Sequence, residues 1–281
     1  MTAKDQTDHP QTTLWNGPAG HAWVEAQELL DSVFAPITER LVDAIPAGTA
    51  SQVLDVGCGT GAIALAIARR LGADGRCVGV DLSAPMIEAA RARAERDGSA
   101  ATFVHADAQR HPFEPGFDRI VSRFGVMFFD DPVQAFANLR RATTDTAGLR
   151  CVAWRDASDN PFMTAAERAA APLLPMLPVR STDGPGQFAF ADERRVRQLL
   201  HASGWTGVEI EPLDVTCTLP EHELMRYVTR LGPVGRALPE VDEATRARVI
   251  DVTRAAFEPY VHGADVRFVA ACWLITAGCE S

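Results

Sequence analysis

Three closely spaced glycines carry the clearest sign of ligand binding in this sequence. Gly57, Gly59 and Gly61 follow a short apolar run, and glycine allows the backbone to approach a ligand closely. Asp55 stands two residues before the first glycine, and Asp81 stands 20 residues after the last. A carboxylate at that spacing can accept both hydroxyl hydrogens of a ribose. The pattern therefore predicts a site for a cofactor that contains ribose.

Other interpretations of these residues stay open at this point. The glycines can serve a tight turn with close helix packing, with Asp81 only opening the next helix. Gly57, Gly59 and Ala62 also satisfy a relaxed dinucleotide fingerprint, so a nicotinamide-dependent oxidoreductase is the second enzyme class. Asp55 argues against a dinucleotide, because a carboxylate suits a cationic ammonium group and is unhelpful beside a pyrophosphate. Its alternative role is a buried carboxylate that accepts from loop amides.

Strands and helices that alternate along the chain must bring these residues to one edge of a sheet. Residues 53–56 are typical of a buried strand, and a helix over 62–71 starts directly after the glycines. A second strand is expected over 76–81, followed by a helix that Ser83 caps. Later strands are expected over 102–105, 118–123, 149–154, 208–213 and 266–275, with helices capped by Asp131 and Asp192. The predicted fold class is α/β, with a doubly wound, Rossmann-like sheet.

Both ends of the chain are expected to add caps to this sheet. Residues 1–13 are polar and predicted to fray, and the apolar residues from 23 to 45 follow one continuous helix face. The pattern loosens in a proline-rich segment, about 156–190, and is helical again over about 219–263. The predicted division is an N-terminal helical cap (1–48), a cofactor-binding Rossmann-like core (49–155), and the rest of the sheet with these two inserted substrate-cap segments (156–281).

Four successive motifs resemble those of class I S-adenosylmethionine-dependent methyltransferases. They read LDVGCGTG, VGVDLS, HADA and FDRIVSRFGVMFF, and they cover roughly residues 50–155. Their spelling is similar to the branch typified by ubiquinone and menaquinone biosynthesis methyltransferases. The outer segments WNGPAGHAWV, WR…NPF and FAFAD are similar to a bacterial group of small-molecule methyltransferases. The resemblance implies a seven-stranded methyltransferase sheet with an antiparallel last strand, helical caps, and S-adenosyl-L-methionine as the cofactor.

The resemblance also implies a role for each motif residue. The backbone from Gly57 through Cys58 to Gly59 would meet the methionine part of the cofactor, with Asp55 near its ammonium group and Asp81 on its ribose. Leu82 and Met86 would pack on the adenine, Asp107 would accept from the adenine amino group, Ala108 would donate its N–H to the ring, and Ser122 and Arg123 would line the floor beside the methionine. The alternatives are core packing for Met86, a turn cap for Asp107, and an ion pair of Arg123 with Asp118 or Asp130.

No residue pattern defines a catalytic acid, base or nucleophile. The seven histidines have no catalytic spacing, but His21 lies in the segment from Trp15 to Trp23, which can fold over the site of methyl transfer. His21 is therefore the leading candidate for a proton acceptor, and Glu25 and Asp159 are weaker ones. The alternative is that the aromatic residues of this segment only anchor the N-terminus. Because the cofactor carries its own sulfonium leaving group, orientation of the acceptor is expected to dominate catalysis.

The methyl acceptor is predicted to be a small, apolar or aromatic organic molecule. Both inserted segments contain bulky apolar residues, among them Met163, Leu173 and Met225, which can form the roof of an apolar pocket. The alternative is that these residues pack on the sheet or against a second copy in a homodimer. The sequence leaves O-, N- and C-methylation open. A non-catalytic module that binds S-adenosylmethionine is the third class of function.

Composition disfavours several other classes of protein. The net charge is −10, and no basic cluster interleaved with aromatic residues points to nucleic acid as a partner. The six cysteines have neither a C-x-x-C pair nor a histidine at metal-ligand spacing, so neither a metal site nor a disulfide framework is expected. The longest apolar stretch, 268–276, is too short to cross a bilayer, and the N-terminal residues are polar. We expect a soluble, cytoplasmic protein with reduced thiols.

Overall fold

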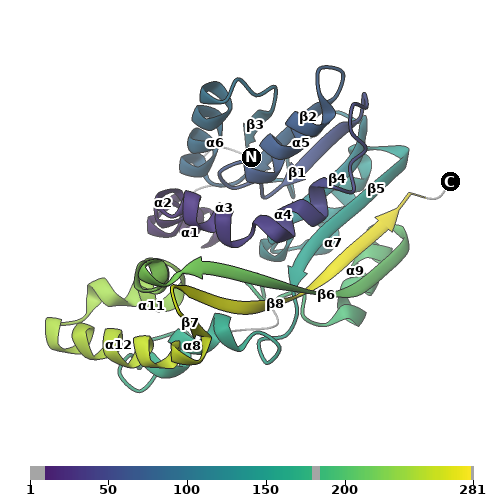
Figure 1. Ribbon diagram of the computed structural model, residues 1–281. Helices are drawn as coiled ribbons and strands as arrows, with labels where there is room; N and C mark the ends of the chain where they lie inside the picture. Colours follow the sequence, from purple (N-terminus) through teal and green to yellow (C-terminus); the bar gives the residue numbers. More distant parts are fainter. Residues whose placement is uncertain (1–9, 179–183, 280–281) are drawn as a thin grey trace.

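The computed structural model describes residues 10–178 and 184–279. Its central sheet has the strand order β3-β2-β1-β4-β5-β8-β6, with helices packed around it (Figure 1). The strands are β1 (Gln52–Val56), β2 (Arg76–Asp81), β3 (Thr102–His105), β4 (Phe117–Arg123), β5 (Thr143–Trp154), β6 (Thr206–Pro220) and β8 (Asp265–Gly278), and a two-residue strand, β7 (Val261–His262), pairs with β8. The predicted fold class, a seven-stranded doubly wound α/β sheet, is confirmed along this path.

One strand of the sheet runs against all the others. The β1–β2, β2–β3, β1–β4 and β4–β5 pairs are parallel, whereas β8 is antiparallel to both β5 and β6. The antiparallel last strand that the resemblance implies is therefore confirmed. The chain moves outward from β1 to β3 and then returns to β4 on the other side of β1. Open α/β sheets bind ligands at the carboxyl ends of the strands at such a switch point, and the glycines follow β1 there.

Four helices connect or cover the strands: α5 (Ala62–Leu71), α6 (Ala84–Arg96), α7 (Pro132–Arg141) and α9 (Glu193–Ala202). Short 3₁₀ turns occur at η2 (Val126–Phe128), η3 (Glu221–Glu223), η4 (Leu238–Glu240) and η5 (Glu258–Tyr260). The predicted caps are confirmed, since the side chains of Ser83, Asp131 and Asp192 accept from the N–H groups of Met86, Gln134 and Arg194 at 3.4, 2.9 and 2.9 Å. These caps fix where α6, α7 and α9 begin relative to the sheet.

The N-terminal cap consists of four short helices, so the prediction of one continuous helix from 23 to 45 is wrong. They are α1 (Pro10–Asn16), α2 (Pro18–Glu25), α3 (Gln27–Val33) and α4 (Ala35–Val42). The break at Phe34 precedes Pro36, which has no N–H to donate and lies in the first turn of α4. The frayed segment predicted over 1–13 is also wrong for its last residues, because α1 begins at Pro10. Residues 1–9 lie outside the described part of the chain.

Strand β6 is longer than the strand predicted over 208–213. Buried Val215, Cys217 and Leu219 alternate with exposed residues beyond that range. This period of two is the mark of a strand with one buried face, and the prediction overlooked it. β6 and β8 form a long two-stranded ribbon that reaches beyond the other strands (Figure 1). The inserted segment predicted from 219 therefore starts after Pro220.

Four helices form a lobe at the end of this ribbon. They are α8 (Pro161–Ala170), α10 (Leu224–Arg230), α11 (Gly232–Ala237) and α12 (Glu243–Ala256). α8 lies within the segment 156–190, where a loose pattern was predicted, and 179–183 of that segment lie outside the described residues. A second apolar cluster joins α8, α11 and α12 through Ala170, Leu174, Val234, Leu238 and Val249. In Figure 1 the N-terminal helices lie between this lobe and the parallel strands. Within 10–178 and 184–279, no helix is long and apolar enough to cross a membrane.

Candidate active site

A cavity of about 1360 Å³ opens at the carboxyl edge of the parallel strands. Its walls come from the glycine turn, the ends of β2 and β4, the N-terminal helices and the lobe. Of the residues predicted from the sequence, it is lined by His21, Gly57, Cys58, Gly59, Asp81, Leu82, Met86, Asp107, Ala108 and Arg123. Asp55 and Ser122 are buried behind this wall, at 1% and 0% exposure. The fold thus gathers the predicted residues around one cavity, with two of them beneath its surface.

The turn after β1 can be built only from glycine. Gly57, Gly59 and Gly61 have φ angles of 66°, 54° and 87°. A Cβ on Gly57 would lie 2.5 Å from the Cα of Gly125, and a Cβ on Gly61 would lie 2.8 Å from the ring of Phe103. The backbone of the turn is therefore packed directly against the loop after β4, which leaves its other side free to face the cavity.

Gly57→Ala is expected to abolish cofactor binding. It should also destabilise the fold by more than the free energy that alanine loses in a left-handed conformation. The matched control is Gly48→Ala, because Gly48 has a similar φ of 64° and a Cβ added there would meet nothing within 4 Å. The left-handed conformation costs alanine about 1–2 kcal/mol at both sites, and only Gly57 adds the clash with Gly125. Urea unfolding of both variants measures the difference. Equal losses of stability would contradict the tight packing described here.

The carboxylate of Asp81 connects β2, the glycine turn and α6. Oδ2 accepts from the N–H of Gly59 at 2.8 Å, and Oδ1 accepts from the N–H of Ser83 at 2.8 Å. Burial raises the pKa of this carboxyl, and the hydrogen bonds from Ser83 and Gly59 oppose that rise. Each carboxylate oxygen has a second lone-pair direction, so both can still accept from a ligand. Asp81 therefore has the helix-entry role that was considered as an alternative, and it also lines the cavity.

Asp55 lies behind the glycine turn with one oxygen unsatisfied. Oδ2 accepts from the N–H of Ala64 at 3.1 Å, whereas Oδ1 has no hydrogen-bond partner. Burial raises the pKa of Asp55 to about 7, an effect that Arg123 and the Ala64 bond oppose and that the charge of Asp81 adds to. A buried carboxylate oxygen without a partner is costly to the fold. Its position beside the turn fits a cationic ligand group.

Ser122 holds the glycine turn and the loop after β4 together. Its hydroxyl donates to the carbonyl of Val56 at 2.7 Å and accepts from the N–H of Gly125 at 3.2 Å. These bonds occupy the hydroxyl behind the cavity wall. Ser122 is therefore placed to position the turn, whereas the resemblance implied that it would line the floor.

Arg123 presents a partly buried cation at the cavity wall. Its guanidinium donates to Thr38 Oγ1 at 2.6 Å and lies 5.6 Å above the ring of Phe34. Burial lowers its pKa, and the charges of Asp31 and Asp55 oppose this shift. Asp118, considered from the sequence as its ion-pair partner, instead accepts from the N–H of Gln52 at 2.8 Å. The cation is held mainly by α4 and by the nearby acids.

The residues predicted for the adenine end surround the cavity next to β2 and β3. The Sδ of Met86, which is 3% exposed, lies 3.7 Å from the position of a Cβ on Gly59. Asp107 accepts from the N–H of Gln109 at 2.9 Å and forms an ion pair with Arg110 at 2.7 Å. The turn-cap role considered for Asp107 is therefore present in the structure. Leu82 and Ala108 line the cavity beside these two residues.

Sequence reasoning missed the residue that fastens the N-terminal helices over this end. Asn16 Nδ2 donates to the carbonyl of Leu82 at 3.1 Å, and Asn16 Oδ1 accepts from the N–H of Ala84 at 2.8 Å. Ser83 Oγ donates to the carbonyl of Trp15 at 2.6 Å. The WNG spelling contained the signal, since asparagine before glycine commonly makes side-chain bonds to backbone at a chain turn. α1 and α2 are thus attached to the loop that follows Asp81.

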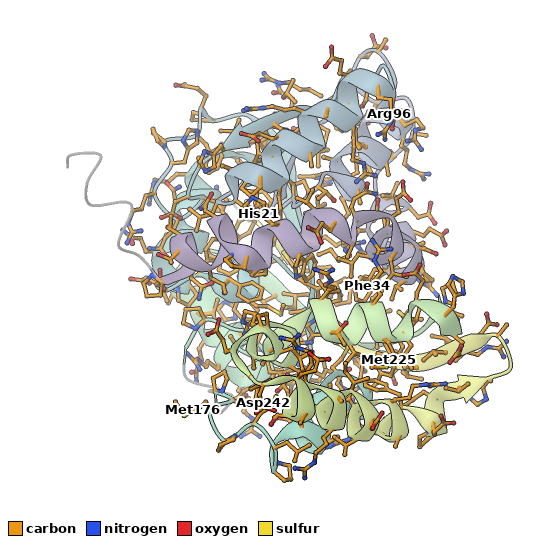
Figure 2. All side chains as sticks on the ribbon, turned by 90° about the vertical axis from the view of Figure 1, so that its left-hand side faces the viewer. His21, Phe34, Arg96, Met176, Met225 and Asp242 are labelled. Carbon is orange, nitrogen blue, oxygen red and sulfur yellow. The ribbon has the colours of Figure 1, made fainter. Side chains whose placement is uncertain are left out.

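His21 lies on α2 at the rim of the cavity, where its side chain is exposed (Figure 2). Its Nδ1 is 3.0 Å from the carbonyl of Gly17. A carbonyl only accepts, so Nδ1 carries the proton in this bond and Nε2 of the neutral ring keeps its lone pair. Glu25 also lines the cavity, 3.9 Å from Arg230, whereas Asp159 pairs with Arg155 at 3.0 Å and does not line it.

The cysteines and acids form no metal centre in the part of the chain that the structure describes. No group of three or more His, Cys, Asp or Glu side chains there could hold a metal ion. All six cysteines are buried free thiols.

Comparison with known proteins shows a similarity to methyltransferases. Residues 53–146 match the family model described as a methyltransferase domain. Over 106 residues the chain is 37% identical to aklanonic acid methyltransferase of Streptomyces sp. (strain C5), covering 37% of this chain and 48% of that protein. Over 104 residues it is 38% identical to demethylmenaquinone methyltransferase of Thermus thermophilus, covering 36% and 46%. The chain thus spans about half the length of these two curated relatives.

Two longer matches are with proteins whose names give no activity. An uncharacterized protein of Mycobacterium tuberculosis is 30% identical over 182 residues, covering 64% of this chain and 63% of that protein. The YcgJ protein of Bacillus subtilis has the same fold, with a TM-score of 0.58, 16% identity and coverage of 88% of this chain and 99% of that one. These matches confirm the resemblance to class I S-adenosylmethionine-dependent methyltransferases, including the menaquinone branch. None of these four proteins is a nicotinamide-dependent oxidoreductase by name.

Proposed function

We propose that this protein transfers a methyl group from S-adenosyl-L-methionine to a small, apolar or aromatic organic acceptor. The observation that carries the proposal is the position of Asp81. Its carboxylate accepts from the glycine turn, and it lines a cavity with room for a cofactor and an acceptor. Two features fit this cofactor: the glycine turn presents backbone without side chains to the cavity, and Asp55 leaves an unpartnered buried oxygen suited to an ammonium group.

The cofactor would supply an electrophilic methyl group on a sulfonium, and the residues of this chain would bind and orient it. Gly57, Cys58 and Gly59 would hold the methionine part together with Asp55 and Arg123, and Asp81 would accept from the ribose. Leu82, Met86, Asp107 and Ala108 would hold the adenine, while Ser122 would position the turn. Trp15 and Trp23, whose rings pack edge to face at 5.9 Å, would exclude water from the transfer.

In the proposed reaction each segment of the chain has its own role. The N-terminal cap (1–48) and the lobe within 156–281 would enclose the acceptor, and the core (49–155) would bind the cofactor. A small molecule, rather than nucleic acid, fits the net charge of −10 and the apolar walls. A cytoplasmic location and a homodimer that uses the cap segments stay proposals of the same kind.

His21 is proposed as the general base when the acceptor must lose a proton. His21→Ala is then expected to lower kcat at neutral pH by about 10²–10⁴-fold while leaving the affinity for S-adenosylmethionine unchanged. The rate of the wild type should rise with pH as the general base loses its proton, and the variant should lack this rise. An unchanged profile in a variant that still binds cofactor would remove His21 from the mechanism and leave orientation alone. His262→Ala, which removes an exposed histidine that does not line the cavity, is the matched control.

The proposed activity is tested by turnover with a panel of acceptors. Purified protein is incubated with S-adenosylmethionine carrying a labelled methyl group, together with phenols, amines, thiols and activated carbon acceptors. The expected result is acceptor-dependent formation of S-adenosylhomocysteine and transfer of the label to a small molecule. Efficient labelling of nucleic acid or of a protein side chain instead would contradict the proposal. Tight cofactor binding without turnover on any class of acceptor would favour the non-catalytic module.

A further inference from the structure

The hydroxyl of Tyr227 is a polar group in the part of the cavity wall that the lobe supplies. Tyr227 belongs to α10 and lines the cavity together with Phe162, Met163, Val228 and Leu231. Within the part of the chain that the structure describes, the one hydrogen bond of this hydroxyl goes to the Sδ of Met163, at 3.9 Å. A thioether sulfur is a weak acceptor, and a phenolic hydroxyl can both donate and accept. The protein itself therefore satisfies the Tyr227 hydroxyl poorly.

A second hydroxyl of the same helix shows the contrast. Thr229 also lines the cavity, but its Oγ1 donates to the carbonyl of Met225 at 2.7 Å. Burial raises the pKa of the Tyr227 hydroxyl, and Cys217 adds to this rise. Tyr227 consequently keeps its proton at neutral pH and can donate it in a hydrogen bond. A buried hydroxyl without a good partner costs free energy, and a ligand that supplies an acceptor atom removes this cost.

Packing fixes the position of the Tyr227 ring. Its centroid lies 6.2 Å from that of Phe162, which in turn stacks on Phe268 of β8 with centroids 3.9 Å apart and an interplanar angle of 1°. Arg226, the preceding residue, donates to the carbonyl of Glu25 at 2.9 Å, so α10 is attached to the N-terminal cap. Tyr227 is thus part of the wall where the lobe and the N-terminal cap meet. This is the region proposed to hold the acceptor.

We propose that Tyr227 determines acceptor specificity by donating a hydrogen bond from its hydroxyl to a neutral oxygen of the acceptor, such as a carbonyl. The inference rests on the proposed methyl transfer and adds a requirement to it, because an acceptor without such an oxygen leaves the hydroxyl unpaired. A neutral oxygen fits better than a carboxylate, since Phe162 and Met163, which contact Tyr227, carry no charge. Sites built to hydrogen-bond a ligand group discriminate strongly against the analogue that lacks it.

The test measures the binding of 2-decalone, a neutral alicyclic ketone, to protein saturated with S-adenosylhomocysteine. Calorimetry is expected to give an affinity about tenfold lower for Tyr227→Phe than for the wild type. This variant removes only the hydroxyl and keeps the ring that packs on Phe162. The matched control is Tyr260→Phe, because Tyr260, the other tyrosine of the chain, also packs on Phe162, at 5.1 Å, but does not line the cavity. The control should bind 2-decalone as tightly as the wild type.

The carbonyl stretching frequency of bound 2-decalone gives a readout that a merely structural role of Tyr227 would not change. A hydrogen bond to the carbonyl lowers this frequency. The wild type and Tyr260→Phe should therefore show a lower frequency than Tyr227→Phe. In the wild type the frequency should also lie below that of the ketone dissolved in hexane, a comparison that needs no variant to fold.

Several results would overturn the inference. They are no saturable binding of 2-decalone to the wild type, equal affinities of the wild type and Tyr227→Phe, or a carbonyl frequency in the wild type equal to that in hexane. A wild-type protein that fails to bind S-adenosylhomocysteine would instead contradict the proposed function, so the two failures are distinguishable.

Discussion

Asp81→Ala is expected to lower the affinity for S-adenosylmethionine by about 10²–10⁴-fold. Each charge-assisted hydrogen bond from a ribose hydroxyl to a carboxylate contributes roughly 1.5–3 kcal/mol, and two such bonds would be lost. The loss includes an indirect part, because the N–H groups of Gly59 and Ser83 lose their acceptor in the same variant. The glycine turn would then no longer be fastened to β2.

Calorimetric titration of the folded variant measures this effect. Asp118→Asn is the matched control, because Asp118 also accepts a backbone N–H, that of Gln52, but does not line the cavity. Its affinity for the cofactor should equal that of the wild type. Asp81→Asn, which keeps the shape and one acceptor oxygen, should fall between the wild type and the alanine variant. Unchanged affinity in Asp81→Ala would place the ribose elsewhere.

Asp55→Asn is expected to stabilise the ligand-free protein at pH 8 and to weaken cofactor binding at the same time. The pKa of Asp55 is raised from 3.8 to about 7, chiefly by burial. A raised carboxyl pKa means that the folded state binds the proton more tightly than the unfolded state. The resulting stability is complete below pH 3.8 and is lost as pH rises to 7, by on the order of 4 kcal/mol, since one pKa unit is about 1.4 kcal/mol.

Urea unfolding between pH 4 and pH 8 tests the stability part of this prediction. The wild type should lose stability across the window, and Asp55→Asn should lose less because its neutral amide has no proton to release. Asp118→Asn again serves as the control and should keep the slope of the wild type. Parallel slopes for the wild type and Asp55→Asn would contradict the burial of an unpartnered carboxylate.

The affinity for the cofactor should change with pH in the opposite direction to the stability. A cationic cofactor favours the charged carboxylate, so the affinity of the wild type for S-adenosylmethionine should rise as pH increases through 7. Titrations in two buffers that differ in ionisation enthalpy should show proton release on binding near pH 6. Asp55→Asn should bind more weakly and without this release. Arg123 and Asp81, which act on the pKa of Asp55, stay unchanged in both proteins.

The parallel half of the fold was predictable because local signals agree there. The apolar run before Gly57, the glycine turn and the helix over 62–71 each indicate the same strand-turn-helix unit, and the structure places α5 at those residues. The caps at Ser83 and Asp131 were equally clear, because serine and aspartate side chains bind the free N–H groups of a first helical turn. The residues proposed to bind the cofactor lie in motifs within this half.

Some of the remainder had a local signal, and the rest depends on contacts that no local pattern contains. Pro36 was a signal for the break at Phe34. The alternation of apolar and polar residues after 213 was a signal for the full length of β6, and neither was used in the prediction. The conformation of Phe124, whose φ is 64°, has no signature in sequence, because the rings that pack on it, Trp154 of β5 and Phe34 between α3 and α4, are distant in the chain. The attachment of Asn16 to Leu82 joins residues 66 positions apart. Such long-range placement is set by the packed fold.

The electron density of a crystal grown with S-adenosylhomocysteine tests the proposed cofactor site directly. We expect ribose hydroxyls at the carboxylate of Asp81, the homocysteine part along Gly57 to Gly59, and the adenine between Met86 and Asp107. A crystal of the ligand-free protein soaked with NADH is expected to show no nucleotide at this turn. A nicotinamide dinucleotide bound across the turn, or S-adenosylhomocysteine located away from Asp81, would contradict the proposed site.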